Sequence, residues 1–226
     1  MYDFDFDLNV IIEAYPYILE GLKITLLISV TSSFFAFIIG VTIAFLRNTN
    51  NSTVKFLCVA YVEIIRNTPL LVQIYLCYKG LPNIGINLPP LLCGILTLSI
   101  YTGTFIAEVF RSGINSIAHE QYEAARGLGL SRLQTFSLVV FPQAIRIIIP
   151  PLGSQFINLL KNSSLVSFIA VGDLFYVIYK GAVDDFRFFE FFFTGAIIYM
   201  CLTGIIAIIA NLLEYKFKIQ GRTVKI

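Results

Sequence analysis

Residues 24–46 and residues 191–213 are two apolar runs that contain no Asp, Glu, Lys or Arg. A helix needs about 20 mainly apolar residues to cross the hydrocarbon core of a bilayer. Lipid offers no hydrogen-bond partner to a bare backbone, so a run of this kind is stable in a membrane only as a helix. The two runs therefore predict an integral membrane protein.

The composition of the whole chain indicates the same class. Of its 226 residues 57% are hydrophobic and 13% are charged, whereas soluble domains carry about 25% charged residues. The net charge of +2 is too small to indicate binding to nucleic acid.

The acidic start, with Asp3, Asp5 and Asp7, is unlike the basic start of a secretory signal, so we expect the first apolar run to remain as an anchor.

The remaining spans are interrupted by prolines or polar residues. Residues 80–107 lack charge, but Pro82, Pro89 and Pro90 divide them, which predicts a loop followed by a span. A span at 150–171 is interrupted by the polar residues 161–164. We predict an all-α fold with about five spans in a single transmembrane domain, 1–226. The expected spans are residues 22–46, 66–81, 91–110, 150–171 and 191–214.

The distribution of charge predicts the orientation, because cytoplasmic segments of membrane proteins are rich in Lys and Arg. With the N-terminus outside and the C-terminus inside, the bases fall on the cytoplasmic side and the acids on the other. The cytoplasmic bases are then Arg47, Lys55, Arg111, Arg126, Arg132, Arg146, Lys216, Lys218, Arg222 and Lys225. The acids of the opposite face are Asp3, Asp5, Asp7, Glu13, Glu20, Asp184, Asp185 and Glu190.

The cytoplasmic stretch 113–146 is too long for a simple connection between two spans. Residues 116–130 favour a helix that Gly127 and Gly129 end or bend. Ser131 then offers an N-cap for a second helix that runs toward Pro142. The pattern predicts a helix, a glycine turn and a helix outside the membrane.

This stretch resembles the EAA loop of ATP-binding-cassette (ABC) importer permeases, which reads EAA, three residues, Gly, nine residues and Ile-x-Leu-Pro. Glu123, Ala124, Ala125, Gly129 and Pro142 match that order and spacing. The chain departs from the pattern in carrying Val139 for the isoleucine and Phe141 for the leucine. It also has Glu120 where the family usually has a glycine.

The resemblance extends from residue 21 to about residue 214 and is most similar to the polar amino acid (histidine/glutamine/arginine-type) branch. Residues 66–73, 141–144, 150–153 and 156–165 carry it. It implies a permease in the bacterial cytoplasmic (inner) membrane that moves a polar amino acid by alternating access. It also implies a homo- or heterodimer with a like permease, separate ATPase subunits that hold ATP and Mg, and an external solute-binding protein. Glu123, Ala124, Ala125, Gly129 and Pro142 would then dock the ATPase.

Polar residues at membrane depth are the candidates for the solute path. Lys161 could bind a substrate carboxylate or neutralise a buried acid such as Glu108. Asn162, Ser163 and Ser164 could line the path or hydrogen-bond between helices. Two further residues, Tyr101 and Glu108, could face the same path, with a Glu108–Arg111 or Glu108–Lys161 pair as the alternative. The family often has an acid where this chain has Asn162, which argues against a strongly cationic substrate.

Motifs for catalysis and metal binding are missing from the sequence. There is no phosphate-binding GxxxxGK[ST], no GxSxG and no HExxH. The lone His119 has no partner set for a metal, and Cys58, Cys77, Cys93 and Cys201 form neither a CxxC pair nor a zinc spacing. We therefore expect no enzyme, no metal and no cofactor in this chain, with the cysteines in packing roles. An ion-gradient-driven transporter, or an ABC permease for another solute, is the alternative function.

Overall fold

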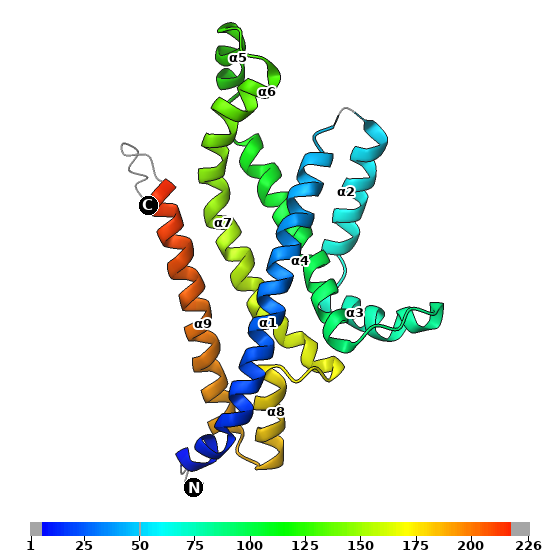
Figure 1. The fold of residues 1–226 in the computed structure, drawn as a ribbon, viewed down its shortest axis with the longest axis vertical. Helices are drawn as coiled ribbons and strands as arrows, with labels where there is room; N and C mark the ends of the chain where they lie inside the picture. The colour runs from blue at the N-terminus through cyan, green and yellow to red at the C-terminus, as the bar shows by residue number, and fades with distance from the viewer. Residues whose placement is uncertain (1–5, 50, 218–226) are drawn as a thin grey trace.

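The computed structural model describes residues 6–49 and 51–217, and every regular element in this part of the chain is a helix (Figure 1). Asp3, Asp5, Lys218, Arg222 and Lys225, which contribute to the charge argument, lie outside the described residues. The elements in chain order are α1 (Leu8–Leu46), α2 (Ser52–Arg66), α3 (Leu70–Tyr75), η1 (Leu76–Gly80), η2 (Leu81–Ile84), α4 (Pro90–Asn115), α5 (His119–Gly127), α6 (Arg132–Gln134), η3 (Thr135–Val140), α7 (Phe141–Asn162), η4 (Ser163–Ile169), α8 (Leu174–Asp184) and α9 (Phe188–Phe217).

Four continuous helical stretches of the described chain are long and apolar enough to cross a membrane. They are Leu8–Leu46, Pro90–Asn115, Arg132–Ile169 and Phe188–Phe217. A fifth candidate is the pair Ser52–Arg66 and Leu70–Ile84, which is bent by 101° at its break. The predicted fold class, an all-α membrane protein with about five spans, is confirmed. The boundaries of the spans within these helices remain predictions.

The most extensive packing in the bundle joins α1 and α4, and two glycines let these helices approach each other closely. A Cβ on Gly40 would lie 2.5 Å from Ile106 Cγ2 and 2.9 Å from the Gly103 carbonyl oxygen. A Cβ on Gly103 would lie 2.8 Å from Ile39 Cγ2. Small residues let membrane helices approach at the backbone, where packing replaces the hydrophobic effect as the force between helices. The pair α1–α4 is therefore closely packed along its length, and α7 and α8 pack against it.

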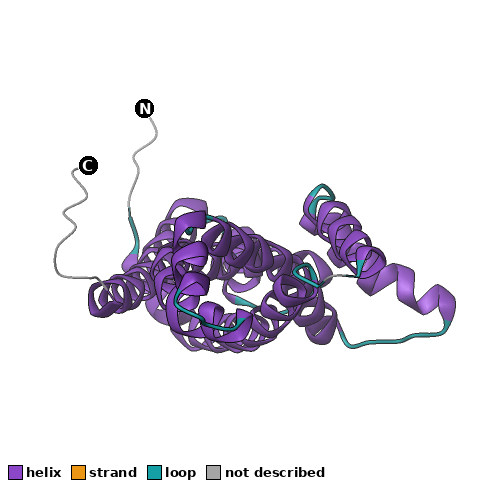
Figure 2. Cartoon of the chain, turned by 90° about the horizontal axis from the view of Figure 1, so that it is seen from above, coloured by secondary structure: helices purple, strands orange, loops and turns teal. Residues whose placement is uncertain are grey.

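The bend between α2 and α3 follows from Pro69, which has no backbone N–H and ends the preceding helix. The free carbonyl groups are satisfied locally. The Gln73 amide donates to the Ile65 oxygen at 2.7 Å and to the Thr68 oxygen at 3.0 Å, and Thr68 Oγ1 donates to Ile64 at 2.7 Å. Beyond the bend, the segment from α3 to η2 extends sideways from the bundle (Figures 1 and 2).

The connection between η4 and α9 contains a helix, α8, which the sequence analysis did not predict. Asp173 is fully buried and caps α8, accepting from Tyr176 N at 3.1 Å and Phe175 N at 3.3 Å. Thr25 Oγ1 on α1 accepts from Leu174 N at 2.9 Å. These bonds fix α8 against the N-terminal half of α1.

The two ends of the molecule carry different short helices. The start of α1 and α8 lie at one end of the long axis, whereas α5 and α6 lie at the other (Figure 1). The C-terminal end of α9 points toward the end that carries α5 (Figure 1). The cytoplasmic position of that end remains a prediction from the charge bias.

Candidate functional site

The segment between α4 and α7 begins with α5, which ends in a tight glycine turn. Gly129 has φ +82°, a backbone conformation that L residues with a side chain rarely adopt. The Gly129 N–H donates to the Arg126 oxygen at 3.0 Å, and the Leu130 N–H donates to the Ala125 oxygen at 3.2 Å. These two bonds form a Schellman motif, which satisfies the last carbonyl groups of α5. The glycine thus fixes the direction in which the chain leaves α5.

The second half of the segment is held by a capping box. Ser131 Oγ accepts from Gln134 N at 3.3 Å, and Gln134 Oε1 accepts from Ser131 N at 2.9 Å. The π-helix η3 then leads directly into α7, where Pro142 lies half-buried in the first turn. Pro142 lies directly after the π-helix, whose i→i+5 bonding, such as Phe141 N–H to the Phe136 oxygen, changes the hydrogen-bond register where proline lacks an N–H.

The three residues of the Glu-Ala-Ala triplet face different surroundings. The Glu123 side chain is 70% exposed, with Oε1 3.3 Å from His119 Nδ1, and Ala124 is exposed. Ala125, in contrast, is only 3% exposed. Glu123 and Ala124 are therefore available to a partner, whereas Ala125 packs inside the loop. That both alanines help to dock an ATPase remains a prediction.

Two exposed leucines near the glycine turn were not identified from the sequence. Leu128 is 83% exposed and Leu133 is 76% exposed. Both lie close in sequence to charged residues, Leu128 two positions after Arg126 and Leu133 directly after Arg132. Large apolar residues in a segment predicted to lie in water are the signal that would have indicated a contact surface.

The loop and the spans share one hydrophobic cluster. Val140 in η3, Ala144 in α7 and Phe110 in α4 are core members, and Tyr122 of α5 and Phe136 of η3 pack against them. Close apolar contacts therefore connect α5 with α4 and α7. We call residues 113–146 the coupling loop below, after the role we propose for it.

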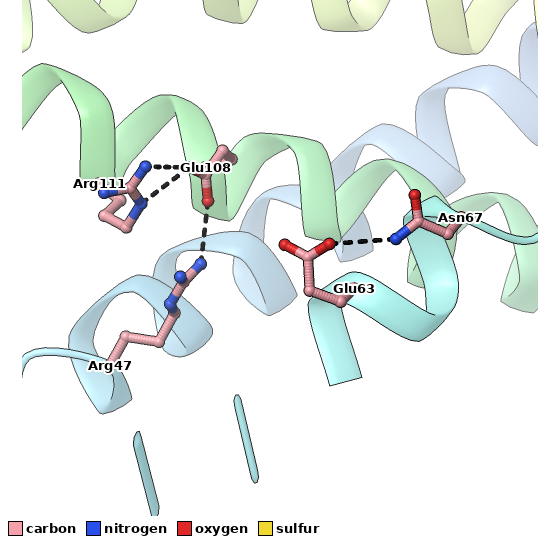
Figure 3. A network of polar contacts seen from close by, with 5 residues as sticks. All are labelled: Arg47, Glu63, Asn67, Glu108 and Arg111. Atoms are coloured by element: carbon pink, nitrogen blue, oxygen red, sulfur yellow. Dashed lines mark hydrogen bonds and ion pairs between the residues drawn. The ribbon is translucent and has the colours of Figure 1, made fainter. Parts of the chain in front are cut away.

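Glu108 on α4 accepts from two arginines (Figure 3). Arg47 Nη1, just after α1, donates to Glu108 Oε2 at 2.9 Å, and Arg111 Nε donates to Oε1 at 2.8 Å. Nearby, the Asn67 amide donates to Glu63 at 3.1 Å (Figure 3). Of the alternatives for Glu108, the structure forms the pair with Arg111 and not the pair with Lys161. Both oxygens of Glu108 are engaged, so it is not free to bind a solute.

Three polar residues lie on the exposed side of α7, in the second half of the helix. Ser154, Asn158 and Lys161 are exposed and recur at spacings of four and three, so they lie on one face of the helix. In the described chain, the Lys161 ammonium makes no hydrogen bond or ion pair. Leu159 shares a core cluster with Ala36, which lies near the middle of the first apolar run. We call Ser154, Asn158 and Lys161 the polar face of α7.

The other residues suggested for a solute path differ in their access. Ser163 is fully buried and its hydroxyl donates to the Leu160 oxygen at 2.8 Å, and Ser164 Oγ donates to the Lys161 oxygen at 2.7 Å. Asn162 is half-buried at the end of α7. Tyr101 is half-buried, and its ring contacts the Phe105 ring at an interplanar angle of 49°, with centroids 5.0 Å apart. Ser154 and Asn158 are exposed polar residues of α7 that sequence reasoning missed.

The structure offers no site for a metal within residues 6–49 and 51–217. No group of three or more His, Cys, Asp or Glu side chains is placed there to hold an ion. The expectation of an ATP and Mg site concerns a partner subunit and stays with the proposed function.

Curated proteins similar to this chain are permeases. One is the "Probable glutamine ABC transporter permease protein GlnM" of Bacillus subtilis (strain 168), 38% identical over 212 residues, with 94% of this chain and 98% of that protein covered. Another is the "Glutamine transport system permease protein GlnP" of Escherichia coli (strain K12), 33% identical over 216 residues, with 95% and 99% covered. The likeness thus covers nearly the full length of all three chains.

Solved structures show the same architecture. A structure described as an amino acid ABC transporter with histidines has a TM-score of 0.88 and 33% identity, covering 94% of this chain and all of that chain. An inward-facing form of the MetNI methionine ABC transporter has a TM-score of 0.77 at 19% identity, which shows the fold alone.

The model of one family matches residues 36–219, and its description is "Binding-protein-dependent transport system inner membrane component". This match and the relatives confirm a membrane subunit of an ABC transporter, with ATP hydrolysis in a separate subunit, and they support that prediction over a gradient-driven transporter. The chain belongs to the family of binding-protein-dependent transport system inner membrane components.

Proposed function

We propose that this chain is the permease subunit of an importer for a polar amino acid. Family membership implies an ATPase subunit and an external solute-binding protein as partners. The names of the relatives, which refer to glutamine or to amino acids, support the substrate class. Glutamine is neutral overall at pH 7, and Asn162 suits such a substrate better than a strongly cationic one.

The polar face of α7 carries the proposal that this chain itself contacts the solute. A lysine at membrane depth costs several kcal/mol if it faces lipid, so it normally faces a cavity or a partner. The Lys161 ammonium is matched to the carboxylate of an amino acid, and Asn158 and Ser154 supply further hydrogen-bonding groups one and two turns away along the helix. Half-buried Asn162 and Tyr101 remain candidates for secondary contacts. We assign no solute contact to Glu108, Ser163 or Ser164.

A second permease subunit would cover the polar face of α7. In the single chain, the three residues of this face are exposed. If the face contacted lipid, the Lys161 ammonium would have no hydrogen-bond or charge partner. A symmetric pair of chains places equivalent faces opposite each other and forms a path along the symmetry axis. The partner copy is a like permease, identical or homologous.

The coupling loop is the proposed contact with the ATPase. Glu123 and Ala124 are exposed, and Gly129 directs the chain so that Leu128 lies in solvent. A short helix in a groove of a soluble partner can transmit a rigid-body movement. Ala125 and Pro142 support the loop from inside, because one is buried and the other starts α7. ATP and Mg bind the partner, and closure of the ATPase pair moves α4 and α7 through their shared cluster.

Purification of the tagged chain from its native membrane in mild detergent tests this function. The expected result is an ATPase recovered in amounts comparable to the chain, and its loss when the coupling loop is altered at Glu123 and Ala124 together. Recovery of the chain with no ATPase, under conditions that preserve the fold, would contradict the proposal.

A further inference from the structure

Arg66, the last residue of α2, places a cation at the depth of the predicted spans. Its guanidinium lies over the ring of Phe105 in α4, with Cζ 4.9 Å from the ring centroid. Gly103, two positions before Phe105, packs on Ile39, and a Cβ on Gly103 would lie 2.8 Å from Ile39 Cγ2. Ile39 is well inside the charge-free run 24–46. The guanidinium of Arg66 is therefore at the level of the first predicted span.

The part of the chain that the structure describes offers no anion to this guanidinium. Within it, the Arg66 side chain forms no ion pair and no hydrogen bond. Glu63, three positions earlier on α2, accepts from the Asn67 amide at 3.1 Å instead (Figure 3). Glu108 on α4 has both oxygens engaged by two other arginines (Figure 3). A cation at membrane depth is costly without a partner, so we expect the acceptor to come from outside this chain.

The surroundings of the guanidinium leave one edge available. Arg66 is half-buried, and its Nε is enclosed and makes no hydrogen bond, whereas Nη1 and Nη2 are not enclosed in this way. The Phe105 ring covers one planar face, and cation–π attraction of this kind holds a guanidinium in place. A guanidinium binds a carboxylate through two parallel N–H···O bonds. The Nη1–Nη2 edge of Arg66 has the two N–H groups that this geometry needs.

The ring of Phe105 also connects Arg66 with Tyr101. Tyr101, one turn earlier on α4, contacts the Phe105 ring with centroids 5.0 Å apart, and it is half-buried. A cation and two aromatic rings from two helices thus lie together. Binding sites for small molecules commonly combine apolar and aromatic side chains with a few polar groups that fix the orientation of the ligand. We call Arg66, Tyr101 and Phe105 the Arg66 site.

We propose, on the basis of the function proposed above, that the Arg66 site is a second position in this chain that binds the carboxylate of the transported amino acid. The first position is Lys161 on the polar face of α7. A carboxylate at membrane depth is stable only beside a cation or another polar partner. Two cations on different helices therefore provide two places along the path where the solute is stabilised, and the aromatic rings contact its methylene groups.

The test measures amino acid binding to the full chain purified with its ATPase, in the absence of the solute-binding protein. The probes are L-glutamine, L-histidine and L-arginine, each compared with its own carboxamide, in which the carboxylate is replaced. Thermal midpoints at increasing probe concentration give the affinities, because a ligand of the folded state stabilises that state by mass action. In the parent complex, at least one amino acid is expected to bind more tightly than its carboxamide.

Variants at Arg66 separate the carboxylate from the rest of the solute. Arg66→Gln is expected to reduce the preference for the amino acid over its carboxamide by about 10–100-fold, because one charge-assisted interaction is lost. Arg66→Lys should recover part of the preference, since lysine keeps the charge but not the paired N–H groups. Lys55→Gln, at an exposed position of the same helix, is the matched control and should keep the full preference.

A second variant covers the case in which Arg66→Gln does not fold. Phe105→Leu leaves Arg66 in place but removes the ring that orients it, so the same preference is expected to fall. The midpoint of each variant without ligand reports whether it is folded.

Two sets of outcomes distinguish this site from the importer function. An unchanged preference for the carboxylate in folded Arg66→Gln, or in folded Phe105→Leu where Arg66→Gln does not fold, would overturn the Arg66 site. If no probe stabilises the parent complex although that complex takes up an amino acid in proteoliposomes, the site is also overturned, and the importer function stands. A parent complex that neither binds nor takes up an amino acid would overturn the proposed function and this site together.

Discussion

Arg47 Nη1 donates to Glu108 Oε2 at 2.9 Å and so joins the C-terminal end of α1 to α4 across 61 residues of sequence. Their side chains are 14% and 25% exposed. Arg111 engages the other oxygen of the same carboxylate. This cluster adds a charged contact to a helix pair already held by the glycines Gly40 and Gly103, and it lies at the cytoplasmic end in the predicted orientation.

Replacing Glu108 by Gln is expected to weaken this contact. Gln keeps the shape but removes the charge, so the two arginines lose charge-assisted hydrogen bonds, at a cost of about 1–2 kcal/mol for a partly exposed group. The expected result is a thermal midpoint in detergent that is lower by roughly 2–8 °C. Arg111→Gln is the control and should have a smaller effect, because that side chain is 43% exposed. An unchanged midpoint in Glu108→Gln would show that the cluster does not stabilise the fold.

Lys161 is expected to contribute to the affinity for the solute and not to the binding of the partner subunits. Lys161→Met keeps the length and removes the charge, and loss of a charge-assisted bond to a carboxylate costs about 1.5–3 kcal/mol, or roughly 10–100-fold in apparent affinity. Uptake as a function of solute concentration measures the change. Lys55→Met, at an exposed position of α2, is the control and should leave uptake unaltered. If Lys161→Met takes up solute with unchanged affinity while its partners remain bound, the polar face of α7 is not part of the solute site.

Gly129 and Gly127 form a matched pair in the coupling loop. A Cβ on either residue would meet no atom within 4 Å, but only Gly129 has a positive φ. Gly129→Ala is therefore expected to strain the turn by about 1 kcal/mol and to reduce ATPase binding. Gly127→Ala should bind normally, because alanine favours the helix. Pull-down of the ATPase with each variant is the measurement. Equal ATPase binding by the two variants would show that the turn at Gly129 is not needed for docking.

The two alanines of the triplet should respond differently to a larger residue. Ala125→Leu inserts atoms into a buried position and is expected to destabilise the loop by about 1–3 kcal/mol. Ala124→Leu stands in solvent, so it should leave the fold intact and weaken docking of the ATPase. Hydrogen exchange in residues 116–142 reports the first effect, and ATPase pull-down reports the second. A folded Ala124→Leu variant with full ATPase binding would place the docking surface elsewhere.

The membrane class and the number of spans could be predicted from the sequence because they depend on local composition. A charge-free run such as residues 24–46 has one stable form in lipid. Helix α8 was not predicted, because its position depends on contacts with distant residues. Its cap Asp173 and its anchor Thr25 are 148 positions apart in the sequence, and no local pattern relates them.

The candidate site was only partly predictable for a similar reason. The order Glu123, Gly129 and Pro142 is visible in the sequence, whereas the burial of Ala125 is set by which side of α5 faces η3 and α7. The polar face of α7 had a sequence signal, since Ser154, Asn158 and Lys161 recur with helical spacing. The contiguous polar residues 161–164 do not form one face of a helix, and Ser163 among them is buried.

Uptake into proteoliposomes tests the central claim most directly. The chain is reconstituted with its ATPase and, where they are distinct, its like permease, and labelled glutamine is supplied with the solute-binding protein outside. The account predicts accumulation inside that requires ATP on the ATPase side and the binding protein on the other, and that excess unlabelled polar amino acid suppresses. Accumulation that an ion gradient drives without ATP or the ATPase would contradict it.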